Sequence, residues 1–369
     1  MHIAKTSLAF FSLLVFSSGG PWLQADSQQA PDIHDGTRRQ DKPPKRKIAL
    51  FFPGLSGTVL ESMSPLIFEE YNQKVLLMYP KQIVDVYSVA SANVNVNDEN
   101  DNGYRDGNPG RNKNQSIETR QNCLNLRSIS IFRALKKNKV PFDIVYAQSC
   151  GLFPALYATK ALSLKDEVDF SQKRARIIQN VCDEVKTRLG RIDLLIVHSQ
   201  DADIRFEINA SRGVYLVARH AYDTRCYICL VKPLREFIKV IPDFHFVVLK
   251  DQAPLYCSLM FPAVDEIDKA LRKKKPRSPK AILISDASGK EILNKADVQN
   301  VARMQIISAI NTVKACKTLN KHEVTDVIII GGDEEKKQIL EKNLFGVRIY
   351  MVATKEDIQH LLAKMQASR

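Results

Sequence analysis

Residues 142–162 read FDIVYAQSCGLFPALYATKAL, and this stretch decides the fold. The apolar run at 142–146 predicts a buried strand, and residues 151–162 predict a helix. Between them Ser149 stands in the pattern x-x-Ser-x-Gly, typical of a sharp strand-to-helix turn that exposes a serine hydroxyl above a sheet. A serine after a strand is also a common helix N-cap, so the pattern alone leaves both interpretations open.

Strands and helices alternate on both sides of this turn. Four further apolar, strand-like runs lie within residues 189–250 and predict a small α+β unit of ferredoxin-like type. We therefore expect an α/β fold: an α/β-hydrolase-like parallel sheet core with an inserted ferredoxin-like α+β subdomain. The predicted core strands are 47–53, 142–146, 281–285, 327–330 and 349–352; the predicted helices are 118–139, 151–162, 166–188, 262–272, 297–319 and 334–343, with a mixed, helical stretch at 64–87 and a helix after 352.

This pattern divides the chain into three parts. Residues 1–46 are the expected leader and linker, and residues 47–188 with 251–369 form the expected α/β core. Residues 189–250 form the subdomain, with strands at 192–197, 213–217, 226–231 and 244–249 and a helix at 233–239. Residues 93–115 are rich in Asn, Asp and Gly, so we expect a disordered insert that buries little apolar area.

Composition narrows the class of protein. The chain has 369 residues and 54 Lys and Arg against 41 Asp and Glu, a formal charge of +13, with 44% hydrophobic residues. These values exclude a wholly disordered, collagenous or coiled-coil chain. Seven cysteines are too few for a disulfide scaffold, and Cys226 and Cys229 lack the second pair that a zinc site needs, so we expect no metal. No basic and aromatic motif indicates nucleic acid.

The N-terminus has the composition of a targeting segment. Residues 7–20 are an apolar run closed by small residues, too short for a comfortable membrane span. A basic, polar stretch follows at 24–47, and this order is similar to the bipartite leader of proteins sent to a plastid through the secretory route. We expect that route and no stable membrane span after leader removal. The alternative is an uncleaved anchor in the endomembrane system.

The segment around Ser149 resembles the nucleophile elbow of malonyl-CoA:acyl-carrier-protein transacylases. Residues 147–170, AQSCGLFPALYATKALSLKDEVDF, are similar to the family's GHSLGEYxALxxAGxLSxxDA. Further segments resemble the family in the same order from residue 47 to the C-terminus: FPG at 52–54, Gln121 in RQNCL, KRARIIQ at 173–179, APLYCSLMFPA at 253–263, the segment at 276–286, and Gly331-Gly332.

The resemblance implies a ping-pong acyl transfer in fatty-acid biosynthesis. Ser149 would take malonyl from coenzyme A as an ester, and the thiol of an acyl carrier protein would then remove it. Arg174 would hold the free carboxylate, beside Gln121, and the backbone N–H groups of Cys150 and Leu55 would bind the oxyanion. The resemblance implies no bound cofactor, with the coenzyme A thioester as substrate, malonyl-CoA and a carrier protein as partners, and a monomer.

The polar members of the site depart from the family pattern. The family's histidine falls on Tyr256, and a phenol with a pKa of ~10 replaces an imidazole base poorly. Ser285 and Asp286 stand where the family has paired Asn, and Gln148 and Leu152 replace its His and Glu. Other bases are conceivable on the subdomain, where the histidines are His198, His220 and His245, each of which is also typical of a structural histidine.

Three accounts fit these departures. The first is an active transferase, weakened by the His-to-Tyr replacement or served by another histidine. The second is a catalytically degenerate relative that binds acyl groups or a carrier protein. The third is a serine hydrolase, disfavoured because no late Asp and His pair follows Ser149 in the order such enzymes use. The basic run at 269–280 holds seven basic and no acidic residues, which suits either a solvated helix end or a landing site for an acidic carrier protein.

Overall fold

The computed structural model describes residues 46–54, 65–79, 116–198, 213–239, 245–331 and 334–367. The expected leader up to residue 45, the expected insert at 93–115, and Leu55 and Gly332 lie outside these residues.

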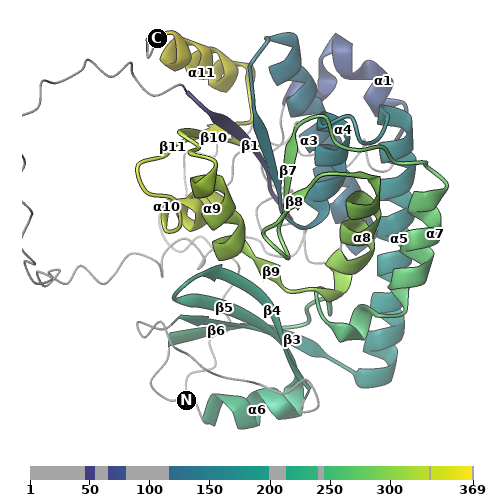
Figure 1. The fold of residues 1–369 in the computed structure, drawn as a ribbon. Helices are drawn as coiled ribbons and strands as arrows, with labels where there is room; N and C mark the ends of the chain where they lie inside the picture. The colour runs from purple at the N-terminus through teal and green to yellow at the C-terminus, as the bar shows by residue number, and fades with distance from the viewer. Residues whose placement is uncertain are drawn as a thin grey trace, which may run out of the picture.

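The main sheet has six strands in the order β11-β10-β1-β2-β7-β8. Neighbouring strands are parallel, except that the short β8 runs antiparallel to β7 (Figure 1). This arrangement confirms the predicted parallel α/β core. The strands are β1 (Ile48–Phe52), β2 (Ile144–Ala147), β7 (Ile282–Ser285), β8 (Glu291–Ile292), β10 (Asp326–Ile330) and β11 (Arg348–Val352).

Both faces of this sheet are covered, which is why its strands read as continuous apolar runs. Alternate residues of β1 enter different cores: Leu50 and Phe52 pack with helices α3, α4 and α5, and Ala49 and Phe51 pack with α9 and α10. The helices that complete these layers are α3 (Ile117–Lys137), α4 (Leu152–Ala158), α5 (Leu164–Leu189), α7 (Ala263–Arg272), α9 (Thr312–Lys321), α10 (Glu334–Glu341) and α11 (Lys355–Ala367).

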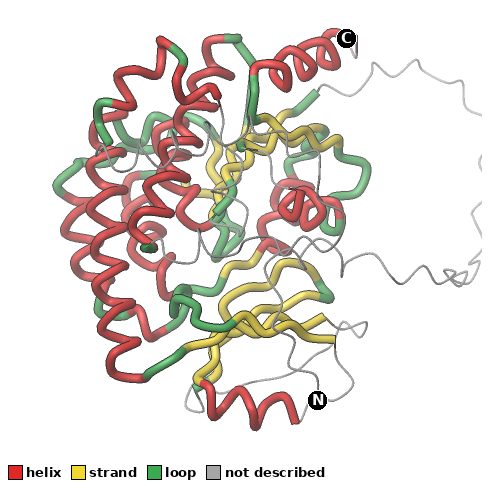
Figure 2. The backbone as a smooth tube through the Cα atoms, turned by 180° about the vertical axis from the view of Figure 1, so that it is seen from behind, coloured by secondary structure: helices red, strands yellow, loops and turns green. Residues whose placement is uncertain are grey.

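A second sheet has the order β6-β3-β5-β4-β9 and forms a separate layer below the main body in Figure 2. Its first four strands are antiparallel in the ferredoxin-like order, and α6 (Val231–Lys239) covers one face. The other face joins the main core through residues such as Ile196 and Ile228. The strands are β3 (Ile192–His198), β4 (Val214–Ala221), β5 (Thr224–Leu230), β6 (His245–Leu249) and β9 (Ile310–Asn311).

The single helix predicted at 297–319 is wrong. The segment forms α8 (Lys295–Met304), a 3-10 turn at Gln305–Ile307, the strand β9 and then α9. Ile310 and Asn311 pair with β4, and the Asn311 side chain caps α9 by accepting a hydrogen bond from the Lys314 N–H. Helical spacing could not show that two residues would add to the second sheet.

The expected helical stretch at 64–87 is only partly helical where it is described. Two 3-10 turns, Pro65–Phe68 and Glu70–Asn72, precede a one-turn helix α1 (Gln73–Leu76). The side-chain amide of Asn72 donates to the carbonyls of Leu66 and Ser130, which holds this irregular segment against α3. Among the described helices, none is long and apolar enough to cross a membrane.

One buried carboxylate lies where the starts of β1, β10 and β11 meet. Asp326, at the start of β10, accepts hydrogen bonds from Arg46 at 2.7 and 3.0 Å and from Arg348 at 2.9 Å. Burial opposes the charged form, but the hydrogen bonds from the two arginines outweigh it and lower the pKa of Asp326 to about 2. Ion pairs with Asp326 therefore connect the residue Arg46 before β1, and Arg348 at the start of β11, to the start of β10.

We predict that this cluster gives an acid-labile share of the stability. Because the pKa of folded Asp326 lies below its ordinary value, its contribution is present above about pH 4 and is lost as the pH falls toward 2. Asp326→Asn should cost about 1 to 2 kcal/mol at pH 7, discounted because Arg348 is half exposed. The free energies of unfolding of the wild type and of Asp326→Asn, measured in urea at pH 7 and pH 3, test this prediction. A loss of stability that is equal at the two pH values would contradict it.

Candidate active site

Ser149 lies on a strained turn directly after β2. It begins the 3-10 turn Ser149–Gly151, and its φ of 58° is in the left-handed region. The turn fits only because its neighbours are glycines: a Cβ on Gly54 would lie 2.4 Å from the Ser149 Cβ, and one on Gly151 would lie 2.3 Å from the Phe52 carbonyl oxygen. This is the geometry that the x-x-Ser-x-Gly pattern predicts.

Two buried side chains hold the backbone of Ser149 in this conformation. The Ser149 N–H donates to the Asp286 carboxylate at 2.6 Å, and the Ser149 carbonyl accepts from the Gln305 amide at 2.7 Å. The same Gln305 amide group lies 3.3 Å from the second oxygen of Asp286. The three residues come from the ends of β2 and β7 and from the turn after α8, so distant segments meet at the elbow.

Arg174 of α5 lies in the same buried cluster, with only 1% of its surface exposed. Its guanidinium donates to the Gln121 side-chain oxygen at 3.0 Å and to the Gln305 side-chain oxygen at 3.4 Å. Its carbon Cζ lies 4.4 Å from the centre of the Phe153 ring. Arg174 is therefore not a solvated helix charge, and the structure brings it together with the predicted Gln121.

The Arg174 charge has no carboxylate bound directly to it among the described residues. Its Nε has no hydrogen-bond partner there, although a guanidinium offers five donors. Burial lowers the pKa of Arg174, opposed by the electrostatic influence of Tyr256, Cys150 and Asp286. A buried guanidinium with unused donors is suited to bind an anion such as a carboxylate.

Tyr256 occupies the place beside the Ser149 hydroxyl. The two hydroxyl groups are in direct hydrogen-bond contact. Tyr256 also has a positive φ, 64°, and its N–H is anchored to the Ile306 carbonyl at 2.9 Å. Burial raises the pKa of the phenol well above its usual value, so Tyr256 is neutral and can donate a proton to a hydrogen bond but cannot act as a base near pH 7.

Cys150 follows Ser149 at the elbow and packs in the main hydrophobic core. The Ser149 hydroxyl donates toward its sulfur at an Oγ to Sγ distance of 3.7 Å. Both side chains are almost equally buried, 4% exposed for Ser149 and 6% for Cys150. Its backbone position after Ser149 is the one predicted for an oxyanion donor; the second predicted donor, Leu55, lies outside the described residues.

The histidines considered as alternative bases lie on the second sheet. His198 of β3 contacts the Thr224 hydroxyl at 3.2 Å and is paired in register with His245 of β6. Burial lowers the pKa of His220 on β4 to about 3. Among the hydrogen bonds of the described residues, none joins an imidazole to the Ser149 hydroxyl.

The cysteine pair of the second sheet faces two different cores. Cys226 packs toward the main body and Cys229 toward α6, because residues three apart on a strand point to opposite faces. None of the seven cysteines forms a disulfide, and no group of three or more His, Cys, Asp or Glu among the described residues could hold a metal ion.

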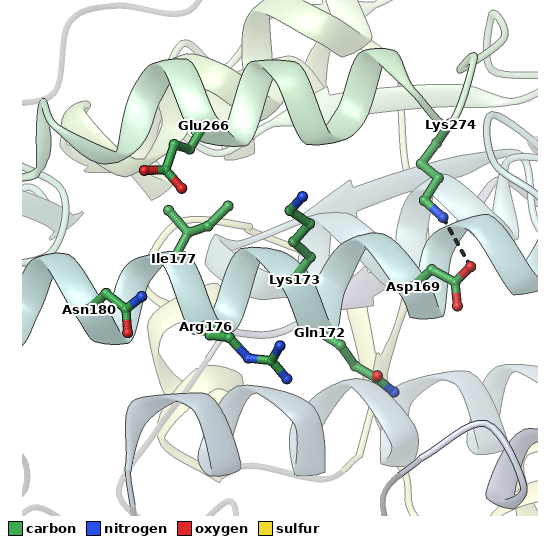
Figure 3. A pocket seen from close by; sticks show the side chains of 8 residues that line it. All are labelled: Asp169, Gln172, Lys173, Arg176, Ile177, Asn180, Glu266 and Lys274. Atoms are coloured by element: carbon green, nitrogen blue, oxygen red, sulfur yellow. Dashed lines mark hydrogen bonds and ion pairs between the residues drawn. The ribbon is translucent and has the colours of Figure 1, made fainter.

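A groove of about 540 Å³ lies on the surface between α5 and α7, away from the elbow (Figure 3). Lys173 and Ile177 rise from α5 toward α7, and Lys274 of the basic run pairs with Asp169 at 2.9 Å. Arg272, from the same run, pairs with Asp268 at 2.7 Å. Part of the basic charge predicted as a landing site is therefore neutralised within the chain.

Sequence reasoning missed two members of the site. Gln305 fell inside the predicted helix at 297–319, where a glutamine is an ordinary polar residue, and nothing in the pattern marked it. Phe153 lies within the helix predicted after Ser149, and nothing in the pattern marked its ring as a partner of Arg174. In the sequence, Asp286 stands out only as a departure from the resembled family's paired Asn, whereas in the structure its carboxylate accepts a hydrogen bond from the Ser149 N–H.

The fold is similar to that of bacterial malonyltransferases of known structure. The malonyl CoA-acyl carrier protein transacylase of Clostridium perfringens superposes with a TM-score of 0.69 at 18% identity, covering 87% of this chain and 98% of that one. The acyl-carrier-protein-S-malonyltransferase of Bartonella henselae gives the same score, identity and share of this chain, covering 99% of its own. The Helicobacter pylori transacylase also scores 0.69, at 14% identity, over 87% and 99%. No family model matches the sequence, and no curated protein is similar to it at the sequence level.

We predict that Asp286 gives a pH dependence opposite in sign to that of Asp326. Burial raises the pKa of Asp286 to about 6, against opposing hydrogen bonds from the Ser149 N–H and Gln305. The folded state therefore holds a proton that the unfolded state has lost, and the Asp286 contribution to stability falls as the pH rises from about 4 to 6. Asp286→Asn should remove this pH dependence. The measurement is the change in the urea midpoint between pH 4.5 and 7, compared between the wild type and the variant. Parallel curves would contradict it.

Proposed function

We propose that this protein binds a malonyl-type acyl thioester of coenzyme A and transfers the acyl group slowly to the thiol of an acyl carrier protein. The observation that carries the proposal is Arg174, a buried guanidinium with unused donors beside the elbow. Gln305 links it to Ser149, since its oxygen accepts from Arg174 and its nitrogen donates to the Ser149 carbonyl. A free carboxylate on Arg174 would thus fix an acyl group beside Ser149. The shared fold supports the same class of reaction.

The chemistry of the proposal is a ping-pong exchange. The Ser149 Oγ forms a bond to the acyl carbon, the bond from that carbon to the coenzyme A sulfur breaks, and the hydroxyl proton ends on the departing thiol. The carrier-protein thiol then reverses the exchange. The Cys150 and Leu55 N–H groups are the proposed oxyanion donors, and no bound cofactor is needed.

The slow rate follows from the hydrogen-bond partner of Ser149. A serine needs a base to become nucleophilic at neutral pH, and the neutral Tyr256 phenol does not supply one. Loss of the base in a serine-based site costs a factor of ~10^4 or more in turnover. We therefore propose turnover far below the ~10 per second that is ordinary for enzymes.

A second candidate is a non-catalytic relative that binds acyl thioesters or a carrier protein. The observation that favours it is again Tyr256, whose hydroxyl lies against the group that would have to react. The two candidates differ in one measurable respect, the formation of a covalent acyl adduct. A serine hydrolase has less support, because the proposed carboxylate pocket and the fold both favour transfer of a charged acyl group.

The place of action is proposed from the leader. A protein sent through the secretory route to a plastid would meet a carrier protein and malonyl thioesters in that compartment. The basic residues of 269–280 other than Arg272 and Lys274, which pair with Asp268 and Asp169, would then provide a contact for the acidic carrier. A fluorescent fusion to residues 1–46 tests the destination, and retention in the endomembrane system would favour the anchored alternative.

Arg174→Gln should weaken malonyl-CoA binding by about 10- to 100-fold and leave acetyl-CoA binding nearly unchanged. The reason is that a charge-assisted hydrogen bond contributes about 1.5 to 3 kcal/mol, and only malonyl carries the free carboxylate. Isothermal titration calorimetry gives both dissociation constants. Arg176→Gln is the matched control, because Arg176 lies on the same helix but is 70% exposed on its side chain. Equal losses for both acyl groups would count against the carboxylate role.

Tyr256→His should raise transfer from malonyl-CoA to the carrier protein by about 100-fold or more. An imidazole would restore a base with a pKa near neutrality, and histidine tolerates the positive φ at this position better than most residues. The rate should also gain a dependence on a group titrating between about pH 6 and 7. Tyr256→Phe is the control, since it removes the hydroxyl without adding a base. A histidine variant no faster than the phenylalanine variant would reject the prediction.

A further inference from the structure

A second cavity lies at the end of α4 that is opposite to Ser149. Its volume is about 550 Å³, within the range of roughly 300 to 1,000 Å³ that is typical of small-molecule sites. α4 begins directly after the elbow turn Ser149–Gly151, and its last residue, Ala158, lines the cavity. A helix of 7 residues spans about 10 Å. None of the residues that line this cavity belongs to the site around Ser149, so the two are separate.

Apolar side chains form the floor of the cavity. The ring of Phe132 lies edge-on to two other rings, with centroid distances of 6.0 Å to Phe142 and 5.7 Å to Tyr157. Val140 and Leu162 line the same space. All five side chains are buried or half-buried, so they lie below the surface rather than projecting from it. A recessed apolar floor suits a small molecule better than insertion into a membrane.

Four basic side chains surround this floor and are exposed: Lys136, Lys139, Lys160 and Arg277. Among the described residues, none of these four takes part in an ion pair or a side-chain hydrogen bond. No acidic residue lines the cavity, whereas Asp169 and Glu266 line the groove between α5 and α7. The cavity therefore combines an apolar floor with a rim of one charge sign.

Three separate segments bring these cations together. Lys139 follows α3 and Lys160 follows α4, with φ angles of 55° and 62° at positions where glycine is usual after a helix. A lysine there also interacts favourably with the helix dipole. That effect does not account for Arg277, which lies between α7 and β7 and is anchored by its N–H, a donor to the Ala161 carbonyl at 2.9 Å.

We propose that this cavity binds a small anionic amphiphile, a single free molecule with an apolar body and one anionic group. The apolar body would lie on the rings of Phe132, Phe142 and Tyr157, and the anionic group would lie among the cations of the rim. Burial of apolar area supplies the binding free energy, and the rim selects an anion over a neutral molecule of the same shape. This binding does not depend on the acyl transfer proposed for Ser149.

The test is isothermal titration calorimetry of the full chain with octanoate, 1-octanol and acetate. We expect octanoate to bind at one site, 1-octanol to bind at least about fivefold more weakly, and acetate to give no measurable binding. Hexanoate should bind about tenfold more weakly than octanoate, because it buries two fewer methylene groups. Raising NaCl from about 50 to 500 mM should weaken octanoate binding and leave 1-octanol binding unchanged. Equal affinities for octanoate and 1-octanol, or no octanoate binding, would overturn the inference.

Lys139→Gly and Lys160→Gly test the rim without endangering the fold. Each removes a charge and places glycine where the positive φ favours it, so thermal melts should show no loss of stability. Each should weaken octanoate binding about two- to fivefold, the double variant about tenfold, and neither should affect 1-octanol. Lys275→Gly is the matched control, because Lys275 has a φ of 46° after α7 but does not line the cavity. An equal loss in Lys275→Gly would show a general effect of charge and reject the site.

Two other places for the ligand are separated by further measurements. Arg174 is itself proposed to bind a carboxylate, so the titrations are repeated in an Arg174→Gln background, where octanoate binding and the effects of the rim variants should persist. Octanoate binding that disappears with Arg174 would place the ligand at the elbow and overturn the inference. Co-sedimentation with vesicles of anionic phospholipid tests a membrane surface. Binding to vesicles that is lost in the rim variants, with no binding of octanoate, would reject the free molecule as the occupant.

Discussion

The left-handed backbone of Ser149 is the constraint on which the site depends. It is possible only because Gly54 and Gly151 leave room for the turn, and because Asp286 and Gln305 hold the Ser149 N–H and carbonyl. Such strain persists where the surroundings fix it. Each of these contacts comes from a different strand end or turn, so the order of the parallel strands β1, β2 and β7 is what brings the reactive groups together.

Beside this turn, a buried carboxylate and a buried guanidinium lie near one another without direct contact. Asp286 binds the elbow backbone, Arg174 stacks on Phe153, and the amide of Gln305 lies between them, accepting from the arginine and donating toward the carboxylate. The carboxylate thus offsets part of the arginine's charge while the guanidinium keeps donors unused. The same amide donates to the Ser149 carbonyl, so an anion on Arg174 would act on the elbow through one side chain.

The features that could be predicted from the sequence depend on neighbouring residues or on the order of segments along the chain. The elbow, the parallel core and the ferredoxin-like strand order follow from apolar runs and a short turn pattern, and Arg174 and Gln121 follow from segments in a recognisable order. Gln305 could not be found, because its role depends on a helix ending where β9 joins another sheet. The resemblance marks Tyr256 as a position of the site, but only the structure shows that its hydroxyl contacts the Ser149 hydroxyl.

Tyr256 and an imidazole would act differently on the neighbouring Ser149 hydroxyl. An imidazole can take the serine proton, whereas a phenol of raised pKa stays neutral and cannot. With Tyr256 neutral, the contact at the Ser149 hydroxyl positions that group but removes no proton from it.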